Sequence, residues 1–167
     1  PGEFYQIDME MSFMTQEEIM DLTEKMFTDM IKELFPEKKV MQTPWPRLDH
    51  DEVMKKYKTD KPDLRKNKDD KDELAFAWII NFPLFAKQTE EDKFHGAGDT
   101  WGPSHNMFTA PKEDDIKLLD TDPGKVKSYQ HDLVLNGFEV GGGAVRIHDM
   151  KIQKKISNQI VPYLEAV

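Results

Sequence analysis

Hydrophobic and polar residues alternate strictly over residues 4–14. The apolar set is Tyr5, Ile7, Met9, Met11 and Phe13, and the polar set is Gln6, Asp8, Glu10 and Ser12. Successive side chains of a strand point to opposite faces, so this alternation predicts a half-buried β-strand. Its polar side would carry the carboxylates of Asp8 and Glu10, two residues apart.

Residues 15–35 carry the spacing of an amphipathic helix. Apolar side chains recur every three or four positions, at Ile19, Leu22, Met26, Phe27, Met30, Ile31 and Leu34. Such a stripe packs against a core, so a helix over this range is predicted. Thr15 and Glu18 have the spacing of a capping box at its start, and Pro36 ends it.

The remainder of the chain predicts strands and short helices. The continuous apolar run over residues 74–82 is typical of a central strand buried on both faces. Residues 66–73 are nearly all charged or amide and predict an exposed loop, and the polar segment 89–103 predicts another. The other predicted elements are a helix from Asp49 to about Tyr57, a short helix over 112–119, strands over 126–140 and 144–148, and a final helix from Asp149 to about Ile160.

The composition excludes several classes of function. The chain has 167 residues, enough for one domain, and 38% of them are hydrophobic, which supplies a core. Its 23 Lys and Arg against 32 Asp and Glu give a net charge of −9, which argues against binding nucleic acid by charge alone. The absence of cysteine excludes disulfides, thiolate nucleophiles and cysteine zinc sites, and it suits a reducing cytoplasm. No apolar run approaches the ~20 residues of a membrane span, so no membrane association is predicted.

The most unusual stretch is 132–148, in which polar residues interrupt a strand-like apolar pattern. Asp132 and Glu139 lie between aliphatic residues, and an unpaired buried carboxylate is costly. A lined cleft would resolve that cost, because carboxylates together with phosphate oxygens are ligands that Mg²⁺ prefers. The glycines at 141–143 would let a planar or phosphorylated ligand approach the backbone, and Arg146 could form a bidentate contact with a carboxylate.

The spacing of the two acids creates a conflict within this stretch. Asp132 and Glu139 are seven residues apart, so strict alternation along one strand places them on opposite faces. A shared metal ion would then require a β-bulge, for which Asn136 and Gly137 are the natural position.

The same stretch resembles a pattern of the aspartyl-tRNA synthetase family, in which Asp-x-Val-x-Asn-Gly-x-Glu precedes a glycine triplet and Arg-Ile-His. Residues 4–13 resemble the second strand of that family's motif 2. Further blocks that resemble the family follow in the same order, at residues 43–48, 60–65, 81–85, 108–112 and 118–123. The resemblance extends from Phe4 to about Ile156, and several ordered blocks argue against chance similarity.

The resemblance implies an α+β class II catalytic domain, with an antiparallel sheet flanked by helices. The chain would run from the second strand of motif 2 to just before motif 3, so residues 1–167 would form a partial catalytic domain. The charged loop 66–73 would lie at the site of the inserted domain that is usual in bacterial members. The family is normally dimeric, which implies a homodimer for the full enzyme.

The resemblance also implies a reaction. The family activates L-aspartate with ATP and Mg²⁺ to an aspartyl-adenylate and transfers the aspartyl group to the 3′ end of tRNA-Asp in protein synthesis; use of tRNA-Asn as well stays open. The implied aspartate-binding residues are Arg146, Asp8 and His105, the ATP-binding residues are Glu139, Gly141, Gly142 and Gly143, and the metal ligands are Asp132, Glu139 and Glu10. In-line attack at phosphorus needs no enzyme nucleophile, so none is predicted, and catalysis would rest on positioning and charge neutralisation.

The residues also leave plainer alternatives open. Asp8 and Glu10 fit the solvated face of an edge strand. Arg146 also fits a buried ion pair with Glu139, and His105 fits a surface position. For the whole chain, the alternative is a non-catalytic fragment or paralogue that binds aspartate, an adenylate or a partner protein.

Overall fold

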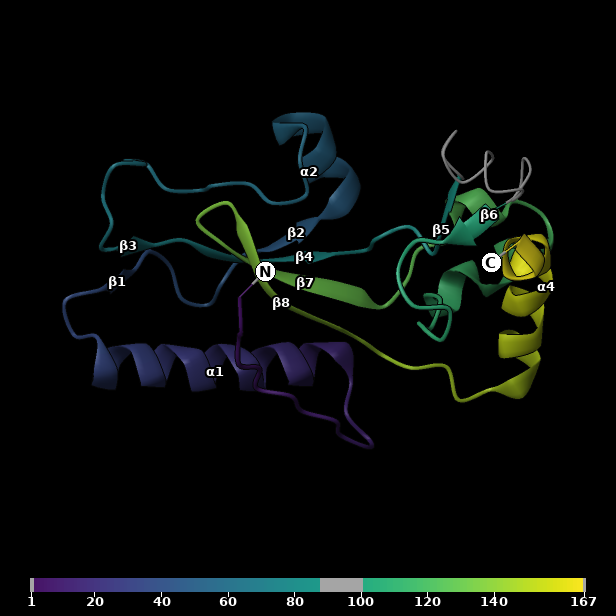
Figure 1. The fold of residues 1–167 in the computed structure, drawn as a ribbon, viewed down its shortest axis with the longest axis horizontal. Helices are drawn as coiled ribbons and strands as arrows, with labels where there is room; N and C mark the ends of the chain where they lie inside the picture. The colour runs from purple at the N-terminus through teal and green to yellow at the C-terminus, as the bar shows by residue number, and fades with distance from the viewer. Residues whose placement is uncertain (1, 88–100, 167) are drawn as a thin grey trace.

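The computed structural model of the chain describes residues 2–87 and 101–166, which form an α+β fold (Figure 1). The helices are α1 (Gln16–Leu34), α2 (His50–Tyr57) and α4 (Met150–Ala166), with the 3₁₀ helices η1 (Glu113–Asp120) and η2 (Pro123–Lys125). The strands are β1 (Lys39–Val40), β2 (Arg47–Asp49), β3 (Glu73–Leu74), β4 (Phe76–Ile80), β5 (Phe85–Lys87), β6 (Trp101–Pro103), β7 (Gln130–Leu135) and β8 (Phe138–Ala144). The predicted fold class is therefore confirmed.

A four-stranded sheet in the order β2-β4-β7-β8 forms the centre of the molecule (Figure 1). β2 pairs parallel to β4, whereas β4 with β7 and β7 with β8 pair antiparallel. The sheet is thus mixed, whereas the resemblance implied an antiparallel one. Residues 76–79 of β4 are buried, which confirms the central strand predicted from the apolar run at 74–82. Two further sheets have two strands each, β1 with β3 and β5 with β6.

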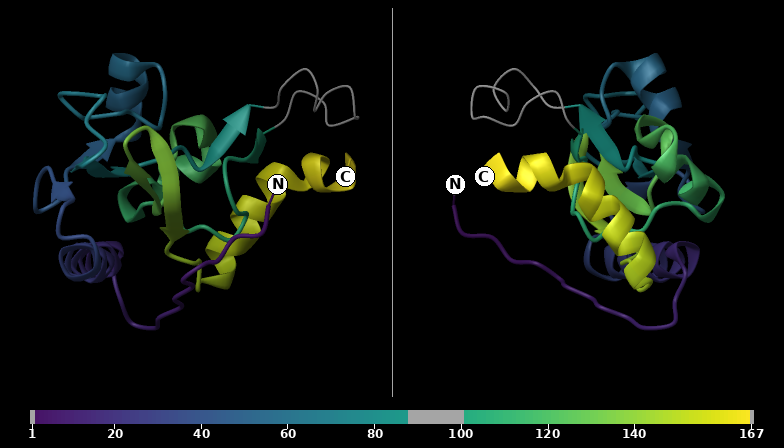
Figure 2. Two further views of the ribbon diagram at one scale, coloured as in Figure 1. Left: turned by 60° about the vertical axis from the view of Figure 1, so that its left-hand side comes forward. Right: turned by 90° about the vertical axis from the view of Figure 1, so that its right-hand side faces the viewer.

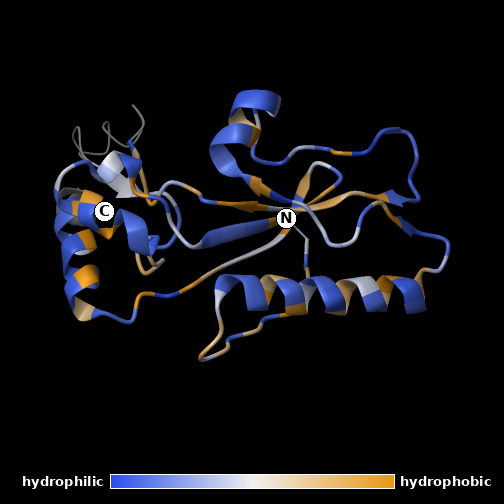
Figure 3. Ribbon diagram, turned by 180° about the vertical axis from the view of Figure 1, so that it is seen from behind, coloured by the Kyte–Doolittle hydropathy of each residue, from blue (hydrophilic) through white to orange (hydrophobic). Residues whose placement is uncertain are grey.

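The two faces of the central sheet pack against different helices. On one face, α1 covers the sheet through a cluster formed by Met20, Ile31, Trp45, Phe76, Trp78 and Leu133. On the other face, α2 covers it through a cluster formed by Val53, Ile79, Phe82 and Val134. Alternation along β4 explains this division, because neighbouring side chains such as Trp78 and Ile79 point to opposite faces. Figure 3 shows hydrophobic residues concentrated in the central strands and in bands along α1.

A second core lies around α4, at the end of the molecule away from β1 and β3 (Figure 1). Its buried members are Leu84, Phe85, Leu119, Val126, Ile156 and Ile160. Asp149 precedes the first turn of α4 as predicted, and its Oδ1 accepts a hydrogen bond from Lys151 N at 2.7 Å. Within residues 2–87 and 101–166, no helix is both long and apolar enough to cross a membrane.

The starts of the first two helices are also as predicted. Thr15 N donates to Glu18 Oε2 at 2.7 Å and Glu18 N donates to Thr15 Oγ1 at 3.3 Å, which completes the capping box of α1. Asp49 caps α2, and its Oδ1 accepts a hydrogen bond from Asp51 N at 2.9 Å.

The remaining minor elements agree with the sequence in part. The helix predicted over 112–119 is present as the 3₁₀ helix η1, and residues 66–72 form no helix or strand. Most of the loop predicted over 89–103 lies outside the described residues, and its last three residues form β6.

The strand predicted over residues 4–14 is wrong. Residues 2–13 are exposed, and Tyr5 and Phe13 are completely so. Figure 2 shows this segment leading away from the sheet as an extended trace. A strand is stabilised by hydrogen bonds to a neighbouring strand, and no described strand pairs with this segment, so its alternation has no partner. Asp8 and Glu10 therefore lie on an exposed segment instead of a sheet.

The single strand predicted over 126–140 is also wrong, because the chain reverses direction within it. β7 and β8 form a hairpin whose two turn residues, Asn136 and Gly137, have φ angles of 51° and 89°. Asn-Gly at positive φ is the preferred sequence of a two-residue hairpin turn. The predicted returning strand over 144–148 is absent, and the glycine triplet lies inside β8.

Candidate functional site

The β7–β8 hairpin brings Asp132 and Glu139 to the same face of the sheet. Glu139 lies directly opposite Val134, and directly opposed residues of an antiparallel pair share a face. Val134 and Asp132 are two residues apart on β7, so they share that face as well. The two acids therefore lie on the side of the sheet that α2 covers. The expectation that they lie on opposite faces is wrong, because it assumed one continuous strand.

A β-bulge is present, but not at the predicted position. The pairing shifts between Leu133, which opposes Gly141, and Val134, which opposes Glu139. Val140 is thus the extra residue of the bulge, on β8. Asn136 and Gly137, the predicted bulge position, instead form the turn.

The two carboxylates have different surroundings. Asp132 is 6% exposed, and its Oδ1 accepts a hydrogen bond from Gln130 Nε2 at 2.8 Å. Burial raises the pKa of the Asp132 carboxyl; the Gln130 hydrogen bond opposes this effect, and the negative charge of Glu139 adds to it. Glu139 is exposed, and its Oε2 lies 2.8 Å from Lys61 Nζ. The hairpin thus presents one buried and one accessible carboxylate.

The glycine triplet lets the β8 backbone approach side chains of β7. A Cβ added at Gly142 would lie 2.9 Å from Asp132 Oδ1, and one added at Gly143 would lie 2.9 Å from His131 Nε2. At Gly141 the nearest atom would be Leu133 Cβ, at 3.9 Å. Any side chain at position 142 would therefore require the carboxylate of Asp132 to shift. Sequence reasoning assigned these glycines to ligand access and missed this packing, which requires knowledge of the cross-strand register.

His105 and Arg146 are both exposed, on segments that flank the hairpin. The His105 ring meets the Phe82 ring edge-on, with centroids 4.9 Å apart, and its charge lowers the pKa of Asp132. The guanidinium carbon of Arg146 lies 4.5 Å from the centroid of the Phe108 ring. The alternative of a buried ion pair between Arg146 and Glu139 is wrong, since Arg146 is exposed and Glu139 pairs with Lys61.

The structure brings only part of the predicted set together. Asp132, Glu139 and Gly142 lie on the hairpin, with His105 close enough to affect Asp132 electrostatically. Over the described ranges, no group of three or more His, Asp and Glu side chains is arranged to hold a metal ion. The predicted ligand Glu10 lies on the exposed N-terminal segment. The metal-binding roles therefore stay predictions.

A buried polar network lies beside the site and is not used by the predicted chemistry. His131 Nδ1 lies 3.2 Å from Gln16 Nε2, and Gln16 Oε1 accepts a hydrogen bond from Lys112 Nζ at 2.9 Å. Burial lowers the pKa of His131 to about 4, and burial also lowers the pKa of Lys112. The Lys112 ammonium lies 4.0 Å from the centroid of the Tyr129 ring. His131 thus holds β7 against the start of α1 as a neutral ring.

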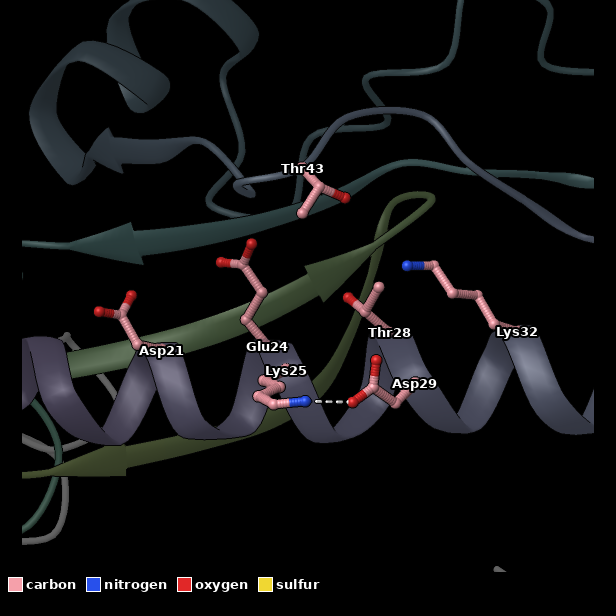
Figure 4. A pocket seen from close by; sticks show the side chains of 7 residues that line it. All are labelled: Asp21, Glu24, Lys25, Thr28, Asp29, Lys32 and Thr43. Atoms are coloured by element: carbon pink, nitrogen blue, oxygen red, sulfur yellow. Dashed lines mark hydrogen bonds and ion pairs between the residues drawn. The ribbon is translucent and has the colours of Figure 1, made fainter.

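Two surface grooves lie away from the hairpin carboxylates. One, of about 350 Å³, lies between α1 and Thr43 (Figure 4). Glu24 lines this groove, and its carboxylate accepts hydrogen bonds from Trp45 N at 2.8 Å and from Arg47 Nη1 at 3.1 Å. The other, of about 300 Å³, has a largely apolar lining that includes Phe35 and Val140. Neither groove contains a predicted site residue, and the contacts of Glu24 are those of a structural ion pair.

Comparisons with known proteins agree on the family. The family model of class II tRNA synthetases (D, K and N) matches residues 1–161. An aspartate–tRNA ligase of Clostridium tetani is 51% identical over 87 residues, which cover 52% of this chain and 14% of that protein. An aspartate–tRNA(Asp/Asn) ligase of Elusimicrobium minutum is 54% identical over 84 residues, which cover 50% of this chain and 13% of that protein.

A solved structure agrees on the fold. The aspartyl-tRNA synthetase of Entamoeba histolytica has a TM-score of 0.51 at 20% identity, with 93% of this chain and 34% of that chain covered. The chain thus matches only a small part of the length of its relatives. Because the family model matches almost the whole chain, the chain belongs to the family of class II tRNA synthetases (D, K and N).

Proposed function

We propose that this chain forms part of the catalytic domain of an aspartate–tRNA ligase. The complete enzyme would activate L-aspartate with ATP to an aspartyl-adenylate, and would then transfer the aspartyl group to the 3′ end of tRNA-Asp with release of AMP. The names of the relatives that share about half of this chain support aspartate as the amino acid. The observation that carries the proposal is the hairpin, which presents Asp132 and Glu139 on one face beside the close-packed Gly142.

The oxygen donors of Asp132 and Glu139 fit a magnesium ion that is also bound by nucleotide phosphates. Glu139 is exposed and accessible to a ligand, while Asp132 is held in place by Gln130. Magnesium would neutralise the phosphate charge that builds up during adenylate formation. Gly141, Gly142 and Gly143 leave the β8 backbone open on the exposed side, where the nucleotide would lie.

The amino acid would be recognised by charge. We assign the side-chain carboxylate of the substrate to Arg146, whose exposed guanidinium can donate two parallel hydrogen bonds. His105 would close over the substrate, and Asp8 would accept its ammonium group once the N-terminal segment is in place. Glu10 would lie beside Asp8, near the metal or the tRNA end. No enzyme nucleophile is required, because the α-carboxylate of aspartate itself attacks the α-phosphorus of ATP and pyrophosphate leaves.

The partners of the complete enzyme belong to the same proposal. They are tRNA-Asp and a second copy of the enzyme, in the cytoplasm. The printed name of the Elusimicrobium minutum relative includes both tRNA-Asp and tRNA-Asn, which makes tRNA-Asn a second candidate substrate.

Calorimetric titration of the chain with a non-hydrolysable aspartyl-adenylate analogue and Mg²⁺ tests the proposal. Saturable binding that prefers the aspartyl over the asparaginyl analogue, and that is lost in Arg146→Ala but partly kept in Arg146→Lys, would support it. Absence of binding by a chain with native circular dichroism would contradict it. That result would favour the second reading, a non-catalytic protein that binds a partner.

A further inference from the structure

Lys61 is held beside the hairpin by the packing of its own segment. The next residue, Pro62, is fully buried. Asp63 and Arg65 form a two-pronged ion pair, with Oδ1–Nε at 3.1 Å and Oδ2–Nη2 at 2.8 Å. The turn residue Gly137 packs against this segment, since a Cβ added there would lie 3.4 Å from Asp63 Cβ. The backbone that carries Lys61 is therefore fixed relative to the β7–β8 turn.

The Lys61 ammonium is surrounded by the negative charges of several carboxylates. Its Nζ lies 2.8 Å from Glu139 Oε2. The hydrogen bond to Glu139 raises the pKa of Lys61, and the charges of Asp60 and Asp132 add to this effect. Besides burial, the charges of Glu139 and Asp60 raise the pKa of Asp132, whereas His105 lowers it. Without Lys61, the mutual repulsion of these three carboxylates would be less compensated.

The ion pair of Lys61 with Glu139 is accessible to solvent, so another cation can replace Lys61. The two side chains are 43% and 42% exposed. Ion pairs this accessible contribute little to folding, because water and salt compete for both partners. By contrast, the ion pair of Asp63 with Arg65 is mostly covered, and it holds the segment. The fold therefore does not require Lys61 to remain on Glu139.

We propose that Lys61 is a tethered counter-ion, which neutralises Glu139 when no divalent cation is bound and must leave that carboxylate before a metal ion can coordinate it. This inference rests on the proposed function, because it takes Asp132 and Glu139 as the metal-binding pair. A lysine and a magnesium ion cannot both occupy the same carboxylate oxygen, so the two cations compete. Lys61 is in this sense a positioning residue that sets the affinity of the site for the metal.

The test is the binding of Mn²⁺ to the chain in the absence of nucleotide. Free Mn²⁺ is measured by electron paramagnetic resonance, and the site is located by paramagnetic broadening of the Gly142 and Glu139 amide signals. Lys61→Met removes one unit charge about 4 Å from a doubly charged ion, and after screening by salt this is expected to tighten binding about ten- to thirty-fold. Lys61→Arg, which keeps the charge, and Lys66→Met, in the exposed loop, are expected to bind as the unmodified chain does.

The possible failures are distinguishable. If Mn²⁺ broadens the hairpin amides and Lys61→Met binds it no more tightly than the unmodified chain, the counter-ion role is wrong and the metal site stands. If Mn²⁺ leaves those amides sharp in both the unmodified chain and Lys61→Met, the metal site is wrong and the counter-ion role falls with it. A gain of equal size in Lys66→Met would also overturn the proposal, because the effect would then be one of net charge.

Discussion

Asp132 and Glu139 lie on one face of the sheet although seven residues separate them, because the chain reverses at Asn136 and Gly137 between them. The reversal makes them neighbours across two strands. Asp132 then lies opposite Gly142, which leaves room for its carboxylate, and Glu139 lies on the accessible edge strand. The turn thus brings the two carboxylates to one face and also places Gly142 opposite Asp132.

Filling the space that Gly142 leaves for the Asp132 carboxylate is expected to lower the free energy of unfolding. In Gly142→Ala the new methyl group would lie 2.9 Å from Asp132 Oδ1, so the carboxylate must shift and strain its hydrogen bond to Gln130. We expect a loss of about 1–2 kcal/mol in the free energy of unfolding, measured by urea denaturation. Gly141→Ala is the matched control, since its methyl group would meet only Leu133 Cβ at 3.9 Å. Equal losses in both variants would show that contact with the Asp132 carboxylate does not decide the effect, since strand propensity alone favours alanine over glycine.

The contact between Arg146 and Phe108 predicts an effect on substrate affinity. The aromatic ring lies 4.5 Å from the guanidinium carbon and orients it without using its hydrogen-bond donors. Phe108→Leu is therefore expected to weaken binding of an aspartyl-adenylate analogue by about two- to five-fold, measured by calorimetry. Phe35→Leu, which removes an exposed ring far along the chain at the end of α1, should leave the affinity unchanged. An unchanged affinity in Phe108→Leu would mean that the ring does not orient Arg146.

Local signals in the sequence predicted the parts of the fold that local interactions determine. The capping box of Thr15 and Glu18 starts α1 through contacts within four residues, and the apolar run at 74–82 contains the buried strand β4. The position of residues 4–14 depends instead on a partner strand, which no local pattern specifies. The alternation of residues 4–14 favours a β-strand, but no strand of the described residues pairs with this segment.

The candidate site was predictable in its residues but not in its geometry. The acids, the glycines and Arg146 stand out in the sequence, yet a reading of 126–140 as one strand separated Asp132 from Glu139. Asn136 and Gly137 were the available signal, because Asn-Gly between apolar segments is a strong hairpin pattern. The partners Lys61 and Phe108 come from distant parts of the chain and could only be found from the fold.

The buried carboxylate of Glu24 is expected to stabilise the connection between α1 and β2. Glu24 accepts hydrogen bonds from Trp45 N and from Arg47 Nη1, so its loss in Glu24→Ala leaves a buried N–H group without an acceptor. We expect a loss of about 3 kcal/mol in the free energy of unfolding, measured by urea denaturation. Glu17 pairs with the same arginine from an exposed position, so Glu17→Ala should cost less than about 0.5 kcal/mol. Similar losses in both variants would contradict the role of burial.

Neutral His131 predicts a dependence of stability on pH. Burial lowers its pKa from 6.5 to about 4 in the folded chain. Between these two values the unfolded chain binds a proton that the folded chain does not, so stability is fully present above pH 6.5 and falls as the pH drops toward 4. The expected loss is about 3 kcal/mol over this range, at about 1.4 kcal/mol per pH unit.

Urea denaturation at several pH values, with His131→Gln as the variant, isolates this contribution. The raised pKa of Asp132 acts in the opposite direction at the acidic end, since there the folded chain binds the extra proton. Asp132 is present in both proteins, so the difference between their pH profiles belongs to the histidine and its direct contacts. His131→Gln should lose most of the slope between pH 6.5 and 4, whereas His148→Gln, at an exposed position, should retain it. An equal slope in His131→Gln and the unmodified chain would mean that folding does not lower the pKa of His131, so that the histidine contributes nothing to the pH dependence.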